Sequence, residues 1–115
     1  MKIKSINDYC KEAHNIARQH GFWGAFAQDL KTVRAYYLHD CNQAEKIALM
    51  HSELSEALEA LRQTDQTKNN VAEELSDCCI RIFDYCGAFE IDLEKEIVKK
   101  MKVNAKRPIR HGKKF

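Results

Sequence analysis

The chain of 115 residues is 44% hydrophobic and 31% charged, with a formal net charge of +2. This balance is typical of a folded protein and excludes a linker or a disordered tail. No apolar run approaches the roughly 18 residues that cross a bilayer, and the start MKIKSINDYC lacks the apolar stretch of a secretory signal. We therefore expect a single cytoplasmic domain over residues 1–115, with reduced cysteines. A domain of this size has a small core, so we expect association between copies to stabilise it.

The small net charge hides an uneven distribution along the chain. Residues 95–115 hold nine Lys or Arg against one acid and so carry +8, which leaves −6 for residues 1–94. An acidic body with a basic end suits a protein that brings a cation and a polyanion together. Basic tails also bind nucleic acid without any chemistry.

The spacing of apolar residues predicts helices from the start of the chain. Ser5 followed by Asp8 resembles a capping box, and apolar residues then recur three and four positions apart until Gly21. This pattern predicts a helix over residues 5–20. Residues 25–41 are expected to be helical in part.

Two long helices are expected at 43–62 and 70–89, and the short polar loop between them predicts antiparallel packing. A last helix is expected at 93–106, followed by a basic tail at 107–115. No alternating strand pattern occurs, so the expected fold class is all-α. The stripes expected to face the core are Ile47, Met50, Leu54, Leu58 and Leu61 on the first long helix and Val71, Leu75, Cys79, Ile82, Cys86 and Phe89 on the second.

Four acidic residues occupy equivalent positions on the two long helices, in Glu53-Leu54-Ser55-Glu56 and Glu74-Leu75-Ser76-Asp77. At about 100° per residue the two acid pairs have the same phase relative to their leucines. Antiparallel packing then places Glu53 near Asp77 and Glu56 near Glu74. Clustered carboxylates raise one another's pKa values, and a divalent cation removes that penalty. An all-oxygen set suits Mg²⁺ or Mn²⁺ rather than zinc.

Ordinary solvated acids produce the same Glu-x-x-Glu pattern, and this is its usual meaning when it occurs once. Two copies in the same helical phase favour a metal site instead. Arg81 lies four residues after Asp77, so it could form a simple ion pair with that acid or could hold a phosphate. The sequence leaves both roles of Arg81 open.

Glu-x-x-Glu, a gap of seventeen residues and then Glu-x-x-Asp together resemble the MazG-type all-α nucleoside triphosphate pyrophosphohydrolases. The resemblance covers roughly residues 43–115. It implies a four-to-five-helix bundle assembled as a homodimer or homotetramer, with substrate sites near subunit contacts. It assigns magnesium binding to Glu53, Glu56, Glu74 and Asp77, and substrate binding to Lys100, Asn104, Arg107 and an aromatic residue, here Trp23.

The implied reaction is Mg²⁺-dependent hydrolysis of nucleoside triphosphates to the monophosphate and pyrophosphate, which removes unwanted nucleotides. Glu56 is expected to act as the general base that orients the attacking water, and Arg81 is a further candidate for phosphate binding.

Three alternatives stay open at this point. The substrate could be dUTP or phosphoribosyl-ATP specifically, because an acidic site reads the triphosphate and says little about the base. The protein could instead be a non-catalytic helical protein that binds nucleic acid through its basic tail. It could also be a structural helical oligomer with solvated acids.

Overall fold

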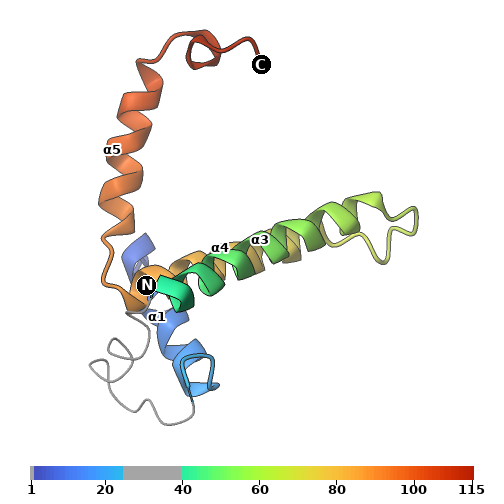
Figure 1. The fold of residues 1–115 in the computed structure, drawn as a ribbon, viewed down its shortest axis with the longest axis vertical. Helices are drawn as coiled ribbons and strands as arrows, with labels where there is room; N and C mark the ends of the chain where they lie inside the picture. The colour runs from blue at the N-terminus through green and yellow to red at the C-terminus, as the bar shows by residue number, and fades with distance from the viewer. Residues whose placement is uncertain (1, 25–39) are drawn as a thin grey trace.

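The computed structural model describes residues 2–24 and 40–115, with side chains from residue 43 onward in the second range. Its helices are α1 (Ile6–Gln19), α3 (Asp40–Arg62), α4 (Val71–Ala88) and α5 (Leu93–Ala105), and a short 3₁₀ turn, η1 (Ile109–Gly112), follows them (Figure 1). No strand occurs among the described residues, so the all-α prediction is confirmed. The partial helix expected at 25–41 lies almost wholly outside the described residues.

Helix α1 begins at the capping box that the sequence predicts. The backbone N–H of Asp8 donates to Ser5 Oγ at 3.1 Å, and the N–H of Ser5 donates to Asp8 Oδ2 at 2.9 Å. These two bonds satisfy donors that have no partner within the helix. The helix ends at Gln19, and Gly21 then adopts a left-handed conformation with φ of 83°.

Helices α3 and α4 form an antiparallel hairpin, as expected. Near its base, Tyr85 Oη donates to Gln43 Oε1 at 2.8 Å. Farther along, Glu56 on α3 lies beside Glu74 on α4. Residue numbers therefore increase in opposite directions along the two helices.

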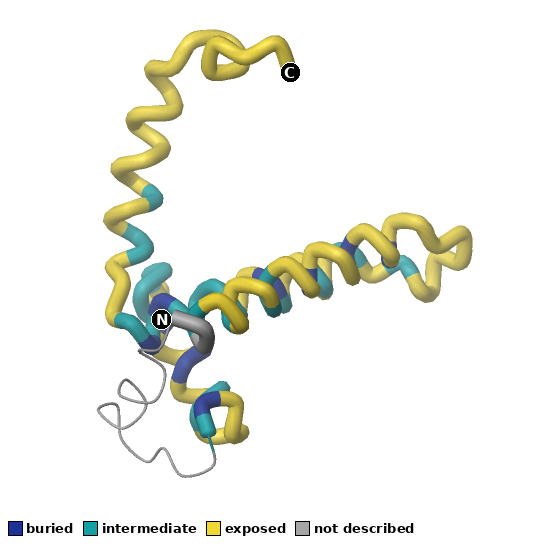
Figure 2. Tube along the Cα trace, viewed as in Figure 1, coloured by how far each residue is buried: buried dark blue, intermediate teal, exposed yellow. Residues whose placement is uncertain are grey.

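Helix α1 packs against the C-terminal half of α4, and glycine permits their close approach. A Cβ atom at Gly87 would lie 2.3 Å from the Cys10 carbonyl oxygen and 2.8 Å from His14 Cβ. The fully buried Trp23 and Ala88 form the centre of the core beside this crossing. Figure 2 shows buried positions near this crossing and between α3 and α4, while the loop at the far end of the hairpin and most of α5 are exposed.

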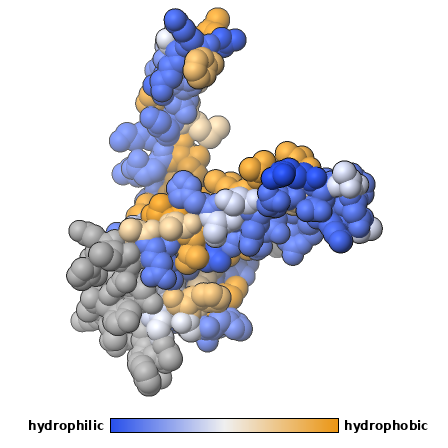
Figure 3. Space-filling model, turned by 45° about the vertical axis from the view of Figure 1, so that its right-hand side comes forward, coloured by the Kyte–Doolittle hydropathy of each residue, from blue (hydrophilic) through white to orange (hydrophobic). Residues whose placement is uncertain are grey.

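The prediction for the core face of α3 is wrong. Leu54, Leu58 and Leu61 are 49%, 57% and 64% exposed. The buried positions are instead Glu53, Ala57 and Ala60, which lie one residue earlier and thus about 100° around the helix. A pair of helices buries only the narrow strip between them, and alanines in that strip allow the axes to come close. The leucines therefore form a hydrophobic surface along the hairpin, where Figure 3 shows apolar atoms.

The prediction for α4 is wrong in its N-terminal half and right toward its C-terminus. Leu75 and Cys79 are exposed, whereas Cys86 is buried. The reason is that α1 covers only the C-terminal half of α4. Burial raises the pKa of the Cys86 thiol to about 11, so this cysteine is a small apolar core residue at neutral pH.

Residues 93–115, named here the arm, leave the body at α1. Asn7 Nδ2 donates to Asp92 Oδ1 at 2.8 Å, and the N–H of Glu94 donates to Asn7 Oδ1 at 3.2 Å. The Asp92 side chain also caps α5 by accepting from the N–H of Lys95. From Val98 onward every residue is exposed. Figure 1 shows α5 and the hairpin diverging, so the described helices of one chain do not close into a bundle. None of them combines the length and apolar character needed to cross a membrane.

Candidate metal centre

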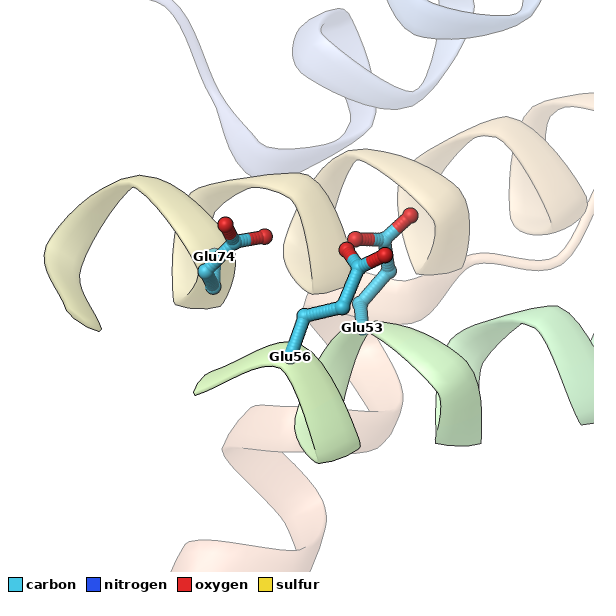
Figure 4. Close-up of side chains that lie close together, drawn as sticks. All are labelled: Glu53, Glu56 and Glu74. Atoms are coloured by element: carbon cyan, nitrogen blue, oxygen red, sulfur yellow. The ribbon is translucent and has the colours of Figure 1, made fainter. Parts of the chain in front are cut away.

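Three of the four predicted metal ligands lie together on the hairpin. Glu53 and Glu56 on α3 and Glu74 on α4 each place one carboxylate oxygen within 4.8 Å of the others. Figure 4 shows the side chains of Glu53 and Glu56 projecting from α3 and that of Glu74 from α4. We call these three residues the carboxylate cluster. The predicted pairing of Glu56 with Glu74 is thus present.

Glu53 is held in place by a cation on the facing helix. Its side chain is buried, and Arg81 Nε donates to Glu53 Oε1 at 2.6 Å. This charge-assisted bond keeps the pKa of Glu53 below its usual range. Among the described residues, the ion pair of Arg81 joins it to Glu53 rather than to Asp77 on its own helix. Arg81 therefore fixes the direction of one predicted ligand and leaves Glu53 Oε2 outside that bond.

Glu56 is in the opposite electrostatic situation, because its neighbours are acids. It is exposed, and the carboxylates of Glu53 and then Glu74 raise its pKa above the usual range for glutamate. The cluster thus holds more negative charge than its single nearby Arg offsets. Oxygen-only ligands, partly open to solvent, fit a hard cation such as Mg²⁺, which retains several of its waters.

The fourth predicted metal ligand, Asp77, lies outside the carboxylate cluster. It is half-buried on α4 and does not belong to the cluster of three, but it lines the same pocket as Glu53. This pocket has a volume of about 920 Å³ and lies where residues of α1, α3 and α4 face one another. Its lining also includes the acids Glu12 and Asp84, the cations Lys46 and Arg81 and the aromatic rings of Tyr9 and Phe83.

The aromatic part of the pocket offers a flat apolar surface. The rings of Tyr9 on α1 and Phe83 on α4 stack with centroids 6.3 Å apart. Lys46 approaches from α3, and burial lowers the pKa of its ammonium group. No local pattern in the sequence marks Tyr9 as a pocket residue, because its partner Phe83 lies on a helix distant in the sequence. Phe83 lies off the main apolar stripe, and that position was the available hint.

The predicted substrate-binding residues of the C-terminal segment lie apart from the cluster within one chain. Lys100 and Asn104 are exposed on α5, and Arg107 is exposed just after it. None of the three lines the pocket, and Figure 1 shows the arm leading away from the hairpin. These three residues therefore lie on one segment, apart from the carboxylate cluster.

Trp23 occupies the core rather than the pocket. It is fully buried, its Nε1 donates to Asp84 Oδ1 at 2.8 Å, and Phe89 packs against its ring. In this arrangement the ring presents no exposed face on which a base could stack. The structure thus gives Trp23 the position of a core residue, contrary to the substrate-binding assignment.

Two polar side chains beside this tryptophan form a contact that the sequence does not predict. His14 Nδ1 lies 2.9 Å from Asp84 Oδ1, the same oxygen that accepts from Trp23. His14 Nε2 is buried without a partner among the described residues. Positions 14 and 84 are 70 residues apart, so no local sequence signal could have joined them. The group ties α1, α4 and the segment after α1 together.

No family model, curated protein or solved structure matches this chain.

Proposed function

We propose that this protein hydrolyses nucleoside triphosphates to the monophosphate and pyrophosphate, with Mg²⁺ bound at the carboxylate cluster and Asp77 beside it. The observation that carries the proposal is the meeting of three carboxylates from two helices within 4.8 Å, at the edge of a pocket of about 920 Å³. Clustered acids with one cationic partner are costly without a further cation. The resemblance of the acidic motifs to MazG-type enzymes adds the reaction and its nucleotide-cleaning role.

The roles of the chain's own residues follow from their surroundings. Glu53, Glu56 and Glu74 would hold the ion, and Mn²⁺ suits the same ligands. Bound Mg²⁺ supplies neutralisation of phosphate charge and activation of water. Arg81 positions the Glu53 carboxylate. Glu56, whose pKa is raised by its acidic neighbours, is suited to accept a proton from the attacking water as general base.

The remaining pocket residues suit the rest of a nucleotide. The stacked rings of Tyr9 and Phe83 provide a surface for a base, and Lys46 provides positive charge for phosphates. A stacking surface accepts any base through its π face. This favours a broad nucleotide substrate class over an enzyme restricted to dUTP or phosphoribosyl-ATP.

The test is incubation of the purified full chain with Mg²⁺ and a panel of ribo- and deoxynucleoside triphosphates, including dUTP and phosphoribosyl-ATP. Pyrophosphate and orthophosphate are measured separately. We expect pyrophosphate with several substrates and loss of its release in Glu56→Gln. The matched control is Glu59→Gln, which changes an exposed α3 glutamate that pairs with Arg62. Orthophosphate alone, or equal activity in both variants, would contradict the proposal.

One other function has a specific observation in its favour. The arm is exposed and strongly basic, which suits nucleic-acid binding without chemistry. That function predicts DNA or RNA binding in EDTA, with affinity that falls steeply as salt rises. Fluorescence anisotropy with a labelled oligonucleotide, alongside the nucleotide panel, separates the two functions.

A further inference from the structure

We infer that Trp23 is a positioning residue for the proposed reaction, because its buried ring holds the ammonium group of Lys46 at the pocket wall, where Lys46 binds the phosphates of the substrate. The triphosphate as ligand rests on the proposed function, whereas the contact between the two side chains does not. Trp23 thus acts on the substrate through a lysine and not by stacking on the base.

The ammonium group of Lys46 is held by two groups of the segment that follows α1. Its Nζ lies 4.4 Å from the centroid of the Trp23 ring and donates to the Phe22 carbonyl oxygen at 2.8 Å. A cation over the face of an indole is attracted by the ring, and most strongly where water is excluded. Lysine has a long and flexible side chain, so these two contacts select one position for its charge.

The Trp23 ring is a fixed support because its own neighbours hold it. It is fully buried, and its Nε1 donates to Asp84 Oδ1 at 2.8 Å. The rings of His14 and Phe89 pack against it in edge-on geometry, with centroids 5.1 and 6.0 Å away. His14 Nδ1 also lies 2.9 Å from the same Asp84 oxygen. The indole cannot turn without breaking its bond to Asp84, so the position that it gives to Lys46 is fixed as well.

Lys46 lies on the same face of α3 as Glu53 of the carboxylate cluster. The two residues are seven positions apart, which corresponds to about two turns and about 10 Å along the helix axis. Both line the pocket, together with Arg81. Burial lowers the pKa of Lys46, Asp84 opposes this shift and the positive charge of Arg81 adds to it, so the ammonium group is within electrostatic range of both. Phosphates that extend from the metal site along the pocket therefore approach Lys46.

The pocket needs a cation in a fixed place if it is to bind phosphates. Its described lining has two cations, Lys46 and Arg81, against four acids, which are Glu12, Glu53, Asp77 and Asp84. Arg81 is bound to Glu53. A lysine that is ordered before the ligand arrives loses less conformational entropy on binding, which favours affinity. Removal of the Trp23 ring should therefore weaken phosphate binding even where the fold persists.

The positioning role is tested first by the kinetics of full-chain variants with nucleoside triphosphate and Mg²⁺. Trp23→Leu removes the aromatic face and should raise KM about tenfold while kcat changes about twofold or less. Trp23→Phe keeps an aromatic face for Lys46 and should recover most of this loss. The control is Phe89→Leu, which removes a ring that packs on Trp23 and should lower stability without raising KM. Equal rises of KM in Trp23→Leu and Phe89→Leu would overturn the inference, because a loosened core would explain both.

The binding step is tested without catalysis by titration calorimetry with inorganic tripolyphosphate and Mg²⁺. Lys46→Met keeps most of the length of the side chain but not its charge, and it should raise the Kd about tenfold. Trp23→Leu should weaken binding to the wild-type lysine but add nothing in the Lys46→Met background, because both changes remove one interaction. If Trp23→Leu does not fold, Trp23→Phe takes its place, with an expected rise in Kd of about twofold.

The outcomes separate this inference from the proposed reaction. Equal weakening by the Trp23 change in both backgrounds would overturn the positioning role. A wild-type Kd that Lys46→Met leaves unchanged, or no binding of tripolyphosphate by the wild type, would overturn it too, even with pyrophosphate release intact. Coupled binding in a protein that releases no pyrophosphate would instead refute the proposed reaction and leave the contact of Trp23 and Lys46 as the phosphate-binding device.

Discussion

The two halves of α4 contain acidic side chains in opposite surroundings. Near the C-terminal end, Asp84 accepts hydrogen bonds from His14 and Trp23 and lies beside the buried core. Near the N-terminal end, Glu74 faces two further carboxylates across the hairpin. An acid that is surrounded by donors of its own chain stabilises the fold. Acids that face one another repel, and this difference separates the end of α4 that packs in the core from the candidate site.

The largest expected effect is on catalysis at the N-terminal half. Glu56→Gln and Glu74→Gln should each lower the rate of pyrophosphate release on the order of 100-fold or more, because each removes a charged ligand. The free energy of unfolding should stay the same or rise slightly, since repulsion between carboxylates is relieved. Activity assays and circular dichroism during urea unfolding measure the two quantities. If either variant also lost a large part of its free energy of unfolding, the distinction between the two halves of α4 would not hold.

The next effect concerns stability at the C-terminal half. Asp84→Ala should lower the free energy of unfolding by about 2–4 kcal/mol, because two donors of His14 and Trp23 lose their acceptor near the core. Asp84→Asn keeps an acceptor oxygen and should lose less. Urea unfolding of both variants gives the values. If Asp84→Ala were as stable as the wild type but inactive, Asp84 would belong with the functional acids.

A third prediction tests the close helix crossing beside Asp84. Gly87→Ala should destabilise the protein by about 1–3 kcal/mol, because the new Cβ atom would meet the Cys10 backbone at 2.3 Å. This loss should occur although alanine favours a helix over glycine by about 1 kcal/mol. Ser76→Ala, at an exposed position of the same helix, is the control and should change stability little. A stabilised Gly87→Ala variant would show that α1 and α4 adjust freely.

The smallest effect is a pH dependence of metal binding. The folded state raises the pKa of Glu56, so this group favours folding at low pH, and that contribution is lost as pH rises from the ordinary glutamate range through the raised value. Mg²⁺ should bind the deprotonated cluster and add about 1.4 kcal/mol of stability at a tenfold excess over its dissociation constant. Melting temperatures with and without Mg²⁺ across a pH series should show this increment disappearing as pH falls. An increment that is independent of pH would place the metal elsewhere.

Local features of the fold followed from the sequence. The capping box of α1 and the bounds of α5 depend on neighbouring residues, and the structure confirms the first and agrees with the second to within one residue. The sequence did not predict which faces of the hairpin helices are buried. Helical periodicity identifies an apolar stripe, but it does not say which helix covers it. Only α4 packs closely on α3 among the described helices, so the alanine strip is buried and the leucines are not.

The candidate site was predictable to a similar extent. Equal helical phase and antiparallel packing were enough to bring Glu56 to Glu74. They could not show that Arg81 reaches across to Glu53, because a long side chain has several partners within range. The direction of the arm depends on Asn7, which lies 85 residues from Asp92. Such long-range bonds leave no periodic trace in one sequence.

The single tryptophan makes the α1–α4 crossing directly observable. Trp23 is fully buried, with its indole N–H bonded to Asp84 and the Lys46 ammonium group 4.4 Å from its ring centroid. Its fluorescence emission therefore depends on how well water is excluded from the α1–α4 contact and on the charges near the ring, and no added label is needed. Emission should be blue-shifted and shielded from acrylamide in the folded protein, and it should move to the red when α1 separates from α4. Because Glu53 of the carboxylate cluster pairs with Arg81, one turn of α4 before Asp84, an optical change on adding metal would show that the cluster and this junction are coupled.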